Sequence, residues 1–258
     1  MKKRKVKKKK KTAILIAIGA ILLTFGFAAF IGLHFFRPQL VSLYHRIREY
    51  TLVRKDSEYS HYRDADGNIV IWLDPGHGGT DPGATSDFLG EETESSINYR
   101  LCLLLKDELT QYGYTVKLTR DENSLPSENG QYPYSERYDA ITSDPEADLY
   151  ISIHCNSYTD SSVGGSRLYY YAEASGYNPY LAAAIADGIE DSHSEDRPRL
   201  YPLSDTTGFA SYKKSALPSI LLETLFVSNE KDAEKLLDPE WLAAEAKGIA
   251  AGIHHFIG

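Results

Sequence analysis

Residues 69–79 read IVIWLDPGHGG, and this stretch decides the fold that the rest of the chain must complete. Its first five residues are β-branched or apolar, which is the composition and length of a buried strand. The strand runs into the loop Asp74-Pro75-Gly76-His77-Gly78-Gly79, with Asp81-Pro82-Gly83-Ala84 behind it. The glycines and prolines predict a tight loop that passes close to another group, with one imidazole set in it. A phosphate-binding loop is the rival interpretation, but G-x-G-x-x-G and a Lys-Ser/Thr pair after the glycines are both absent.

Downstream of this loop, short apolar or β-branched runs alternate with longer amphipathic stretches, which is typical of a sheet whose strands are joined by helices. The predicted fold class is α/β, a single mixed, mostly parallel sheet covered by helices. Chemistry in such sheets collects at the carboxyl ends of the strands. We expect strands at 69–73, 115–118, 149–153, 167–171 and 219–222, and helices at 93–112, 135–143, 179–191, 230–237 and 239–256.

The N-terminal part has a different composition. Nine of the 28 Lys and Arg lie in residues 2–11 and no acidic residue precedes Glu49, so the rest of the chain has 19 basic against 36 acidic residues, a net charge of −17. Such an acidic domain is a poor partner for nucleic acid, whose binding depends on Lys and Arg contacts to phosphates.

Residues 13–36 read AILIAIGAILLTFGFAAFIGLHFF, long enough to cross a hydrocarbon core of roughly 30 Å as one transmembrane helix. The basic flank predicts a cytoplasmic tail at 1–12. A juxtamembrane linker at 37–67 and an exported folded domain at 68–258 would follow. A cleaved signal peptide is the alternative, but its apolar core would be about 7–15 residues long.

Only two cysteines, Cys102 and Cys155, are present, so a disulfide framework does not hold this domain together. Both fall in apolar patterns, where a small buried side chain is the ordinary interpretation. We expect free thiols, although the sequence leaves one bridge open.

A second histidine ends another apolar run, in Ile151-Ser152-Ile153-His154-Cys155-Asn156-Ser157. Alternation along a strand puts Ser152, His154 and Asn156 on the face opposite the two isoleucines. His77 alone would more often be structural than a ligand, and His154 alone favours neither interpretation, but two histidines at the ends of two strands of one sheet can converge.

Two carboxylate positions complete the candidates. Residues 91, 92 and 94 are glutamates at the start of the first predicted helix, where acidic residues usually complement the helix dipole, and spacing alone does not select among them. Glu223 follows the apolar run 218–222. Because an unpaired buried carboxylate is costly, the ordinary interpretation is an exposed side chain and the alternative is a functional site.

Two histidines, one carboxylate ligand and one free carboxylate are the components of a catalytic zinc hydrolase, in which a metal-bound water has a pKa of about 7. In order along residues 69–258, the motifs resemble those of the zinc-dependent N-acetylmuramoyl-L-alanine amidases, a family that hydrolyses bacterial peptidoglycan. Each piece is common alone, and the ordered set is specific. The pieces are DPGHGG-x-DPGA at 74–84, the acidic helix start ending in Asn98, LTRD at 118–121, ER at 136–137, SIH-x-N at 152–156 and E-x-x-F-x-SN at 223–229.

The resemblance implies a helix-covered mixed sheet and one Zn²⁺ per domain held by His77, Glu94 and His154. It selects Glu94 because this residue stands four positions before Asn98, as the family's ligand does before its Asn. Glu223 would be the catalytic residue, accepting a proton from the attacking water and delivering it to the L-Ala nitrogen. Peptidoglycan would be the substrate, reached from a single-pass anchor in the bacterial cell membrane, and the sequence identifies no protein regulator.

Two features depart from the family pattern. Leu225 stands where the family usually has Gly, which predicts a changed floor of the site, and the stretch 120–137 is longer than in the shortest members. No segment is long and apolar enough to be the inhibitory helix that some relatives insert over the metal.

Three other functions are weighed against this one. A zinc peptidase acting within the stem peptide would use the same chemistry, but H-E-x-x-H is absent and neither histidine has a Glu three residues later. A serine hydrolase would require G-x-S-x-G, which does not occur. A wall-binding pseudoenzyme would be expected to lack a ligand or the base, and all four positions are filled.

Overall fold

A computed structural model describes residues 68–121, 134–171, 173–193, 200, 203–204 and 216–258. The predicted tail, transmembrane helix and linker at 1–12, 13–36 and 37–67 lie outside these residues. Within the described ranges, no helix combines the length and the hydropathy that a membrane crossing requires.

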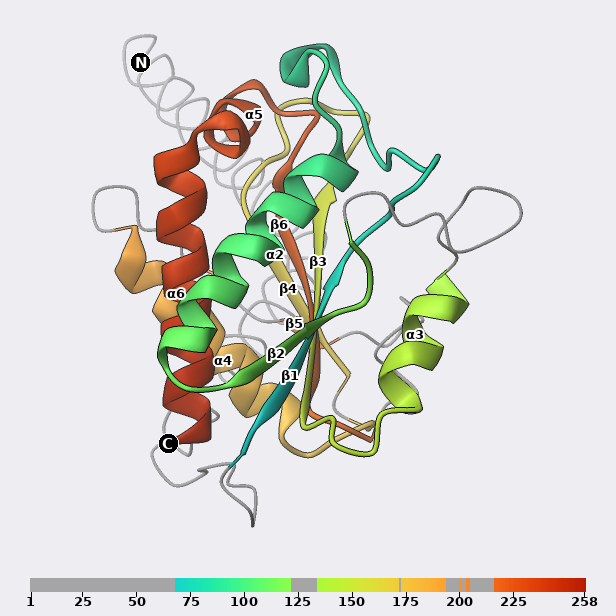
Figure 1. Cartoon of the computed structure of the whole chain (residues 1–258). Helices are drawn as coiled ribbons and strands as arrows, with labels where there is room; N and C mark the ends of the chain where they lie inside the picture. Colours follow the sequence, from blue (N-terminus) through green and yellow to red (C-terminus); the bar gives the residue numbers. More distant parts are fainter. Residues whose placement is uncertain (1–67, 122–133, 172, 194–199, 201–202, 205–215) are drawn as a thin grey trace, which may run out of the picture. The chain divides into compact units, whose positions relative to one another are not determined.

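Each of the ten predicted elements has a counterpart in the structure (Figure 1). The strands are β1 (Val70–Pro75), β2 (Thr115–Leu118), β3 (Leu149–Asn156), β4 (Arg167–Tyr170), β5 (Leu203–Ser204) and β6 (Ser219–Phe226). The helices are η2 (Asp87–Leu89), α2 (Glu94–Gln111), α3 (Tyr134–Thr142), α4 (Asn178–Ser192), α5 (Glu230–Leu237) and α6 (Pro239–Ile257). The short elements β5 and η2 have no sequence signal of their own.

The strands form one six-stranded sheet in the order β2-β1-β3-β6-β4-β5. Neighbouring strands are parallel except for β4, which runs antiparallel to β6. The prediction of a mixed, mostly parallel sheet is therefore confirmed. Because β1, β3 and β6 are parallel neighbours, the residues near their carboxyl ends lie at one edge of the sheet.

The sheet has a large core on one face and a small one on the other. On the first face, α2 packs on β1, β2 and β3, and α6 packs between α2 and α4. Ile97, Leu101, Leu105 and Leu109 of α2 are fully buried there, as their helical spacing predicts, and Leu104 is partly buried. Each fully buried side chain of this kind stabilises the fold by about 1.5–3 kcal/mol. The opposite face carries a smaller cluster of Ile141, Tyr150 and Leu221 beside α3.

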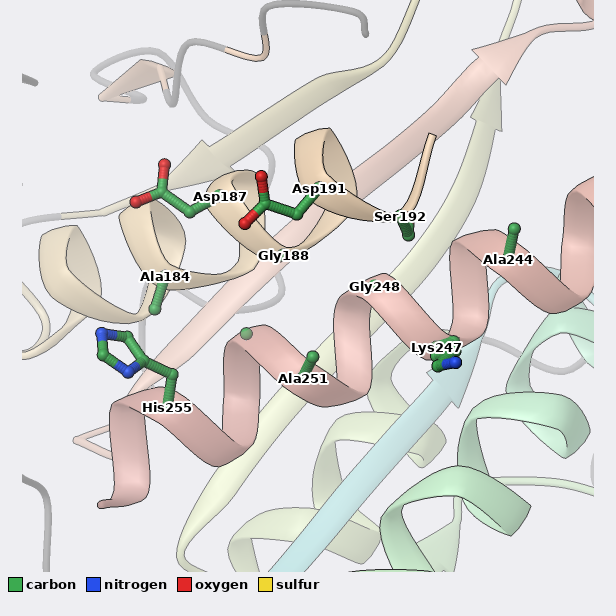
Figure 2. A pocket seen from close by; sticks show the side chains of 11 residues that line it. Ala184, Asp187, Gly188, Asp191, Ser192, Ala244, Lys247, Gly248, Ala251 and His255 are labelled. Carbon is green, nitrogen blue, oxygen red and sulfur yellow. The ribbon is translucent and has the colours of Figure 1, made fainter. Parts of the chain in front are cut away.

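Helices α4 and α6 cross closely because small residues line their contact. A Cβ placed on Gly188 would lie 2.2 Å from the backbone oxygen of Gly248, and one on Gly252 would lie 2.4 Å from that of Ala184. The close crossing leaves a shallow groove with Asp187 and Asp191 on the α4 side and Lys247 and His255 on the α6 side (Figure 2). Helix packing therefore accounts for these glycines.

Two strands continue further than the sequence predicts. The apolar runs used to predict these strands end at Ile153 and Leu222, yet β3 continues through Asn156 and β6 through Phe226. His154 and Glu223 therefore lie inside the sheet, as paired positions of β3 and β6, rather than in loops after it. The backbone pairing of the two strands does not depend on side-chain polarity, so hydrophobicity underestimates their length.

Candidate metal centre

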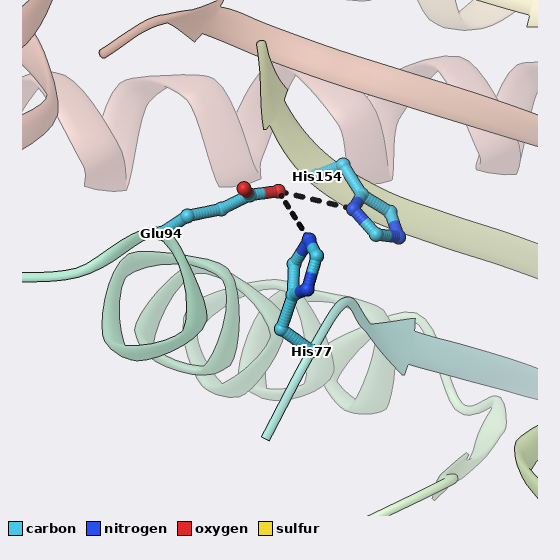
Figure 3. Close-up of side chains that lie close together, drawn as sticks. All are labelled: His77, Glu94 and His154. Atoms are coloured by element: carbon cyan, nitrogen blue, oxygen red, sulfur yellow. Dashed lines mark hydrogen bonds and ion pairs between the residues drawn. The ribbon is translucent and has the colours of Figure 1, made fainter. Parts of the chain in front are cut away.

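The three predicted ligands converge at the carboxyl edge of the sheet. His77 follows β1, Glu94 begins α2 and His154 lies in β3. One donor atom from each residue lies within 4.8 Å of the other two. Glu94 Oε1 is 3.2 Å from His77 Nε2 and 3.0 Å from His154 Nδ1, so the carboxylate lies between the two rings (Figure 3).

The loop that carries His77 adopts a strained conformation. His77 has φ 62°, and among the described residues it is the one non-glycine residue with positive φ. Such strain persists only where surrounding contacts impose it. Here a bridge between Gly78 and Asp81 closes the turn, and His77 Nδ1 donates to Asp81 Oδ2 over 2.9 Å. Asp81 Oδ1 in turn accepts from Gly83 N over 3.0 Å. The ring is thereby held with Nε2 toward Glu94.

Asp81 is not recognisable from the sequence alone as an orienting residue. A histidine that binds a metal usually donates its other ring N–H to a carboxylate or carbonyl, and Asp81 has that position. The one available signal is its place four residues after His77 in the glycine-rich loop.

Of the three glutamates, the structure places Glu94 beside the two histidines. Glu91 is exposed, and Glu92 forms an ion pair with Arg100. Glu94 is 3 % exposed and begins α2 immediately after the capping residue Thr93. Its carboxylate accepts from the backbone nitrogens of Ala84 (2.8 Å) and Cys155 (3.0 Å). These two bonds fix its orientation toward the histidines.

Two glycines make the space that the ligands occupy. A Cβ on Gly76 would lie 2.3–2.5 Å from three atoms of the His154 ring. A Cβ on Gly83 would lie 2.6 Å from His77 Cδ2 and 2.7 Å from Glu94 Oε2. The loop glycines of the DPGHGG-x-DPGA motif therefore serve close approach to the imidazoles.

In the cluster, the carboxylates and the imidazoles stabilise each other's charged forms. Burial lowers the pKa of His77, but the hydrogen bond and charge of Glu94, and then of Asp81, outweigh it and raise this pKa to about 9. Burial raises the pKa of Glu94, but hydrogen bonds from His154 and His77 and the charges of both rings move it far below its usual range. A bound divalent ion would replace the ring protons that face Glu94. Two imidazoles and one carboxylate are a donor set that suits zinc, and their convergence fits such an ion.

Glu223 lies beside this cluster on the neighbouring strand, at the position paired with His154. It is only 8 % exposed, and its Oε2 has no hydrogen-bond partner among the described residues. Burial raises the pKa of Glu223 to about 7. The interpretation of Glu223 as an exposed side chain is therefore wrong, and a buried carboxylate atom without a partner in the described part of the chain is costly.

Asp74 anchors the loop from below and was not distinguishable in the sequence from a turn residue. It is fully buried and forms an ion pair with Arg137 of α3 at 2.8 Å. Its carboxylate also accepts from the hydroxyl groups of Thr119 (2.7 Å), Tyr150 (2.9 Å) and Ser152 (3.0 Å). Burial raises the pKa of Asp74, but Arg137 and the other partners hold it below its usual range.

Two further expectations concern Leu225 and the cysteines. Leu225 is 4 % exposed and belongs to the main core, and the register between β3 and β6 shifts between His154 and Asn156. The side chain thus packs into the core, and the change in the floor of the site stays a prediction. Cys102 and Cys155 are free and buried, as predicted. Of the long stretch 120–137, residues 122–133 lie outside the described residues.

Comparisons with known proteins agree with this geometry. Residues 71–255 match the family model described as N-acetylmuramoyl-L-alanine amidase. The chain is 30% identical over 215 residues to an uncharacterized cell wall amidase of Bacillus anthracis, covering 79% of this chain and 37% of that protein. It is also 30% identical to the N-acetylmuramoyl-L-alanine amidase LytC of Bacillus subtilis, covering 71% of this chain and 34% of LytC. The chain thus spans about a third of the length of these two relatives.

Among solved structures, the chain is similar to the catalytic domain of CwlV, an N-acetylmuramoyl-L-alanine amidase from Bacillus (Paenibacillus) polymyxa. The two share 25% sequence identity with a TM-score of 0.63, over 73% of this chain and 98% of that domain. The family model alone covers well over half of the chain. The chain therefore belongs to the N-acetylmuramoyl-L-alanine amidase family.

Proposed function

We propose that this chain hydrolyses the amide bond between N-acetylmuramic acid and L-alanine in peptidoglycan. The observation that carries the proposal is the buried Oε2 atom of Glu223, which has no hydrogen-bond partner in the described part of the chain and belongs to a residue paired in register with His154. Family membership supplies the bond and the substrate class.

Within this proposal His77, Glu94 and His154 hold one zinc ion. When bound, such an ion polarises the amide carbonyl and lowers the pKa of a coordinated water to about 7. Asp81 orients His77 through Nδ1, and the Asp74 network holds the loop in place. Glu223 Oε2, which has no hydrogen-bond partner in the described part of the chain, accepts the proton of the attacking water and delivers it to the leaving nitrogen. A pKa of about 7 suits both transfers near neutral pH.

The test is Glu223→Gln, which keeps the shape of the side chain and removes the base. We expect it to abolish release of stem peptides from purified wall while zinc content and the far-UV circular dichroism spectrum stay unchanged. Undiminished hydrolysis in this variant would refute the role of Glu223. Mass analysis of the wild-type products identifies the bond, because an amidase leaves free muramic lactyl groups and a peptidase leaves them substituted.

We also propose that residues 13–36 anchor the domain in the bacterial cell membrane, with the N-terminus in the cytoplasm. The proposal rests on the apolar length of this segment and on its basic flank. An acidic domain gains little retention from anionic wall polymers, so the anchor would supply the local concentration near the wall. Residues 68–258 alone should then be less active in cells than the full chain and equally active in a tube. Equal activity of both forms in cells would count against the anchor.

A further inference from the structure

The row of the sheet that holds His154 and Glu223 continues to a third polar residue, Arg167. Strand order places β6 between β3 and β4. Glu223 is paired with His154 on one side and with Arg167 on the other. Neighbouring strands lie about 4.8 Å apart, so Arg167 is the next position beyond Glu223 on the side away from the metal ligands. Arg167 also shares the sheet face of Glu223, since Tyr169, two residues on, is paired with Leu221.

The guanidinium group of Arg167 is held rigidly by one of its edges. Nη1 donates to the carbonyls of Gly165 (3.1 Å) and Ser166 (2.9 Å), and Nη2 donates to that of Gly164 (3.2 Å). Cζ lies 5.3 Å from the centre of the Phe226 ring. The segment 164–166 that supplies these carbonyls is itself held in place, because Asp232 Oδ2 accepts from Gly165 N (2.7 Å) and from Phe226 N (3.1 Å).

These contacts leave the other edge of the guanidinium group available. Arg has five N–H donors, of which the three carbonyls use three. Within the described part of the chain, Nε donates to no acceptor and Arg167 forms no ion pair, not even with Glu223 on the adjacent strand. The side chain is only partly buried. A preorganised guanidinium edge formed by Nε and Nη2 matches the two oxygens of a carboxylate.

The order of groups along this row indicates which part of the substrate meets Arg167. The scissile carbonyl belongs beside the ligands His77, Glu94 and His154, and the leaving nitrogen belongs beside Glu223, which protonates it. The peptide that begins at this nitrogen therefore continues past Glu223 toward Arg167. One extended residue spans about 3.5 Å, so the first two residues of the peptide can reach the position of Arg167.

We propose that Arg167 binds a carboxylate on the peptide side of the scissile amide and thereby selects anionic stem peptides. This subsite rests on the proposed amidase function. In an otherwise acidic domain, a fixed cation on the strand next to that of the base attracts the peptide end of the substrate in one orientation. The side chain acts on binding and orientation, and the proton transfers remain with Glu223.

The test uses two soluble N-acetylmuramoyl peptides that differ only at the second residue, D-glutamate with a free α-carboxyl group or the same residue with a carboxamide. The full chain is loaded with zinc, and kcat and KM are measured for both substrates. A charge-assisted bidentate contact predicts that the wild type prefers the carboxylate by about tenfold to a hundredfold in kcat/KM, mainly through KM. Arg167→Gln should hydrolyse both peptides at the same kcat/KM, and Arg167→Lys should keep part of the preference.

The preference is a ratio measured on one preparation, so partial unfolding of a variant does not affect it. Arg100→Gln is the matched control, because Arg100 of α2 forms its ion pair with Glu92, before that helix, and it should leave the ratio unchanged. A wild type without preference, or Arg167→Gln with the wild-type preference, would overturn the subsite and leave the amidase function standing. If the wild type cleaves neither peptide nor intact wall, the proposed function fails and the subsite with it.

Discussion

Gly76→Ala is the sharpest test of the metal centre, because it adds one methyl group beside a single ligand. The new Cβ would lie 2.3 Å from the nearest atom of the His154 ring, where ordinary contact begins at 3.4 Å. The ring would have to move by about 1 Å, which is half the length of a zinc–nitrogen bond of about 2.0 Å. Gly76 lacks the positive φ that would itself strain an alanine, so the collision is the main perturbation.

The backbone offers little relief for this collision. Gly76 N donates to Ile153 O over 2.9 Å, and Gly76 O accepts from the side chains of Asn98 (3.3 Å) and Arg120 (3.4 Å). We therefore expect the His154 ring to move away from its place beside Glu94. Misplacement of a functional group by about 1 Å costs about a hundredfold, so the dissociation constant for zinc should rise by about that factor.

The assay is competition for zinc against a fluorescent chelator, with thermal unfolding as a second measurement. A hundredfold weaker affinity removes about 2.7 kcal/mol of the stabilisation that saturating zinc provides. Gly176→Ala is the matched control, since a Cβ there meets nothing within 4 Å. Zinc affinity within threefold of the wild type in Gly76→Ala would show that His154 is not a ligand in the observed position.

Four further outcomes are expected. Asp81→Ala should weaken zinc binding by about 10–100-fold, while Asp81→Asn, which keeps an acceptor for His77 Nδ1, should weaken it less, as measured by the same competition. In the metal-free protein, the folded-state pKa of His77 (about 9) exceeds its ordinary 6.5, so its stabilisation is complete below about pH 6.5 and is lost as pH rises through about 9. Urea unfolding with chelator present should show that the free energy of unfolding falls by on the order of 2 kcal/mol across that pH window. A free energy of unfolding that does not change with pH there would contradict the His77–Glu94 contact. The pKa of Glu223 is raised from its ordinary 4.5 to about 7, so the free energy of unfolding falls as pH rises from about 4.5 to about 7 and stays low above it. Metal-free Glu223→Gln should therefore be more stable than the wild type at pH 8, by on the order of 2 kcal/mol, and no more stable at pH 4.5. Arg137→Met leaves the buried charge of Asp74 without its partner and should cost about 3 kcal/mol in urea unfolding at pH 7, whereas a loss below 1 kcal/mol would mean that the hydroxyl donors suffice.

Patterns of side-chain spacing predict most of the fold. Leu101, Leu105 and Leu109 repeat at helical spacing and are all fully buried in α2. Strand ends are harder to predict, because β3 and β6 continue past the polar residues His154 and Glu223, which interrupt their apolar runs. The register shift that turns Leu225 into the core is likewise invisible in a single strand, since it arises between two.

For the site, the sequence identifies the types of residue and the order of the motifs. It does so because the loop glycines, His77 and His154 directly follow apolar runs that are recognisable as strands. Burial and convergence are not local properties. Glu91, Glu92 and Glu94 are equivalent to a reader of the sequence, and only the start of α2 against β3 buries Glu94 between two imidazoles. The contact of Asp81 with His77, the burial of Glu223 and the pairing of Arg167 with it depend on strand order and on a strained loop. Tertiary structure decides these features because they are contacts between segments far apart in the chain. The free energy of such a contact depends on both segments and cannot be inferred from either one alone.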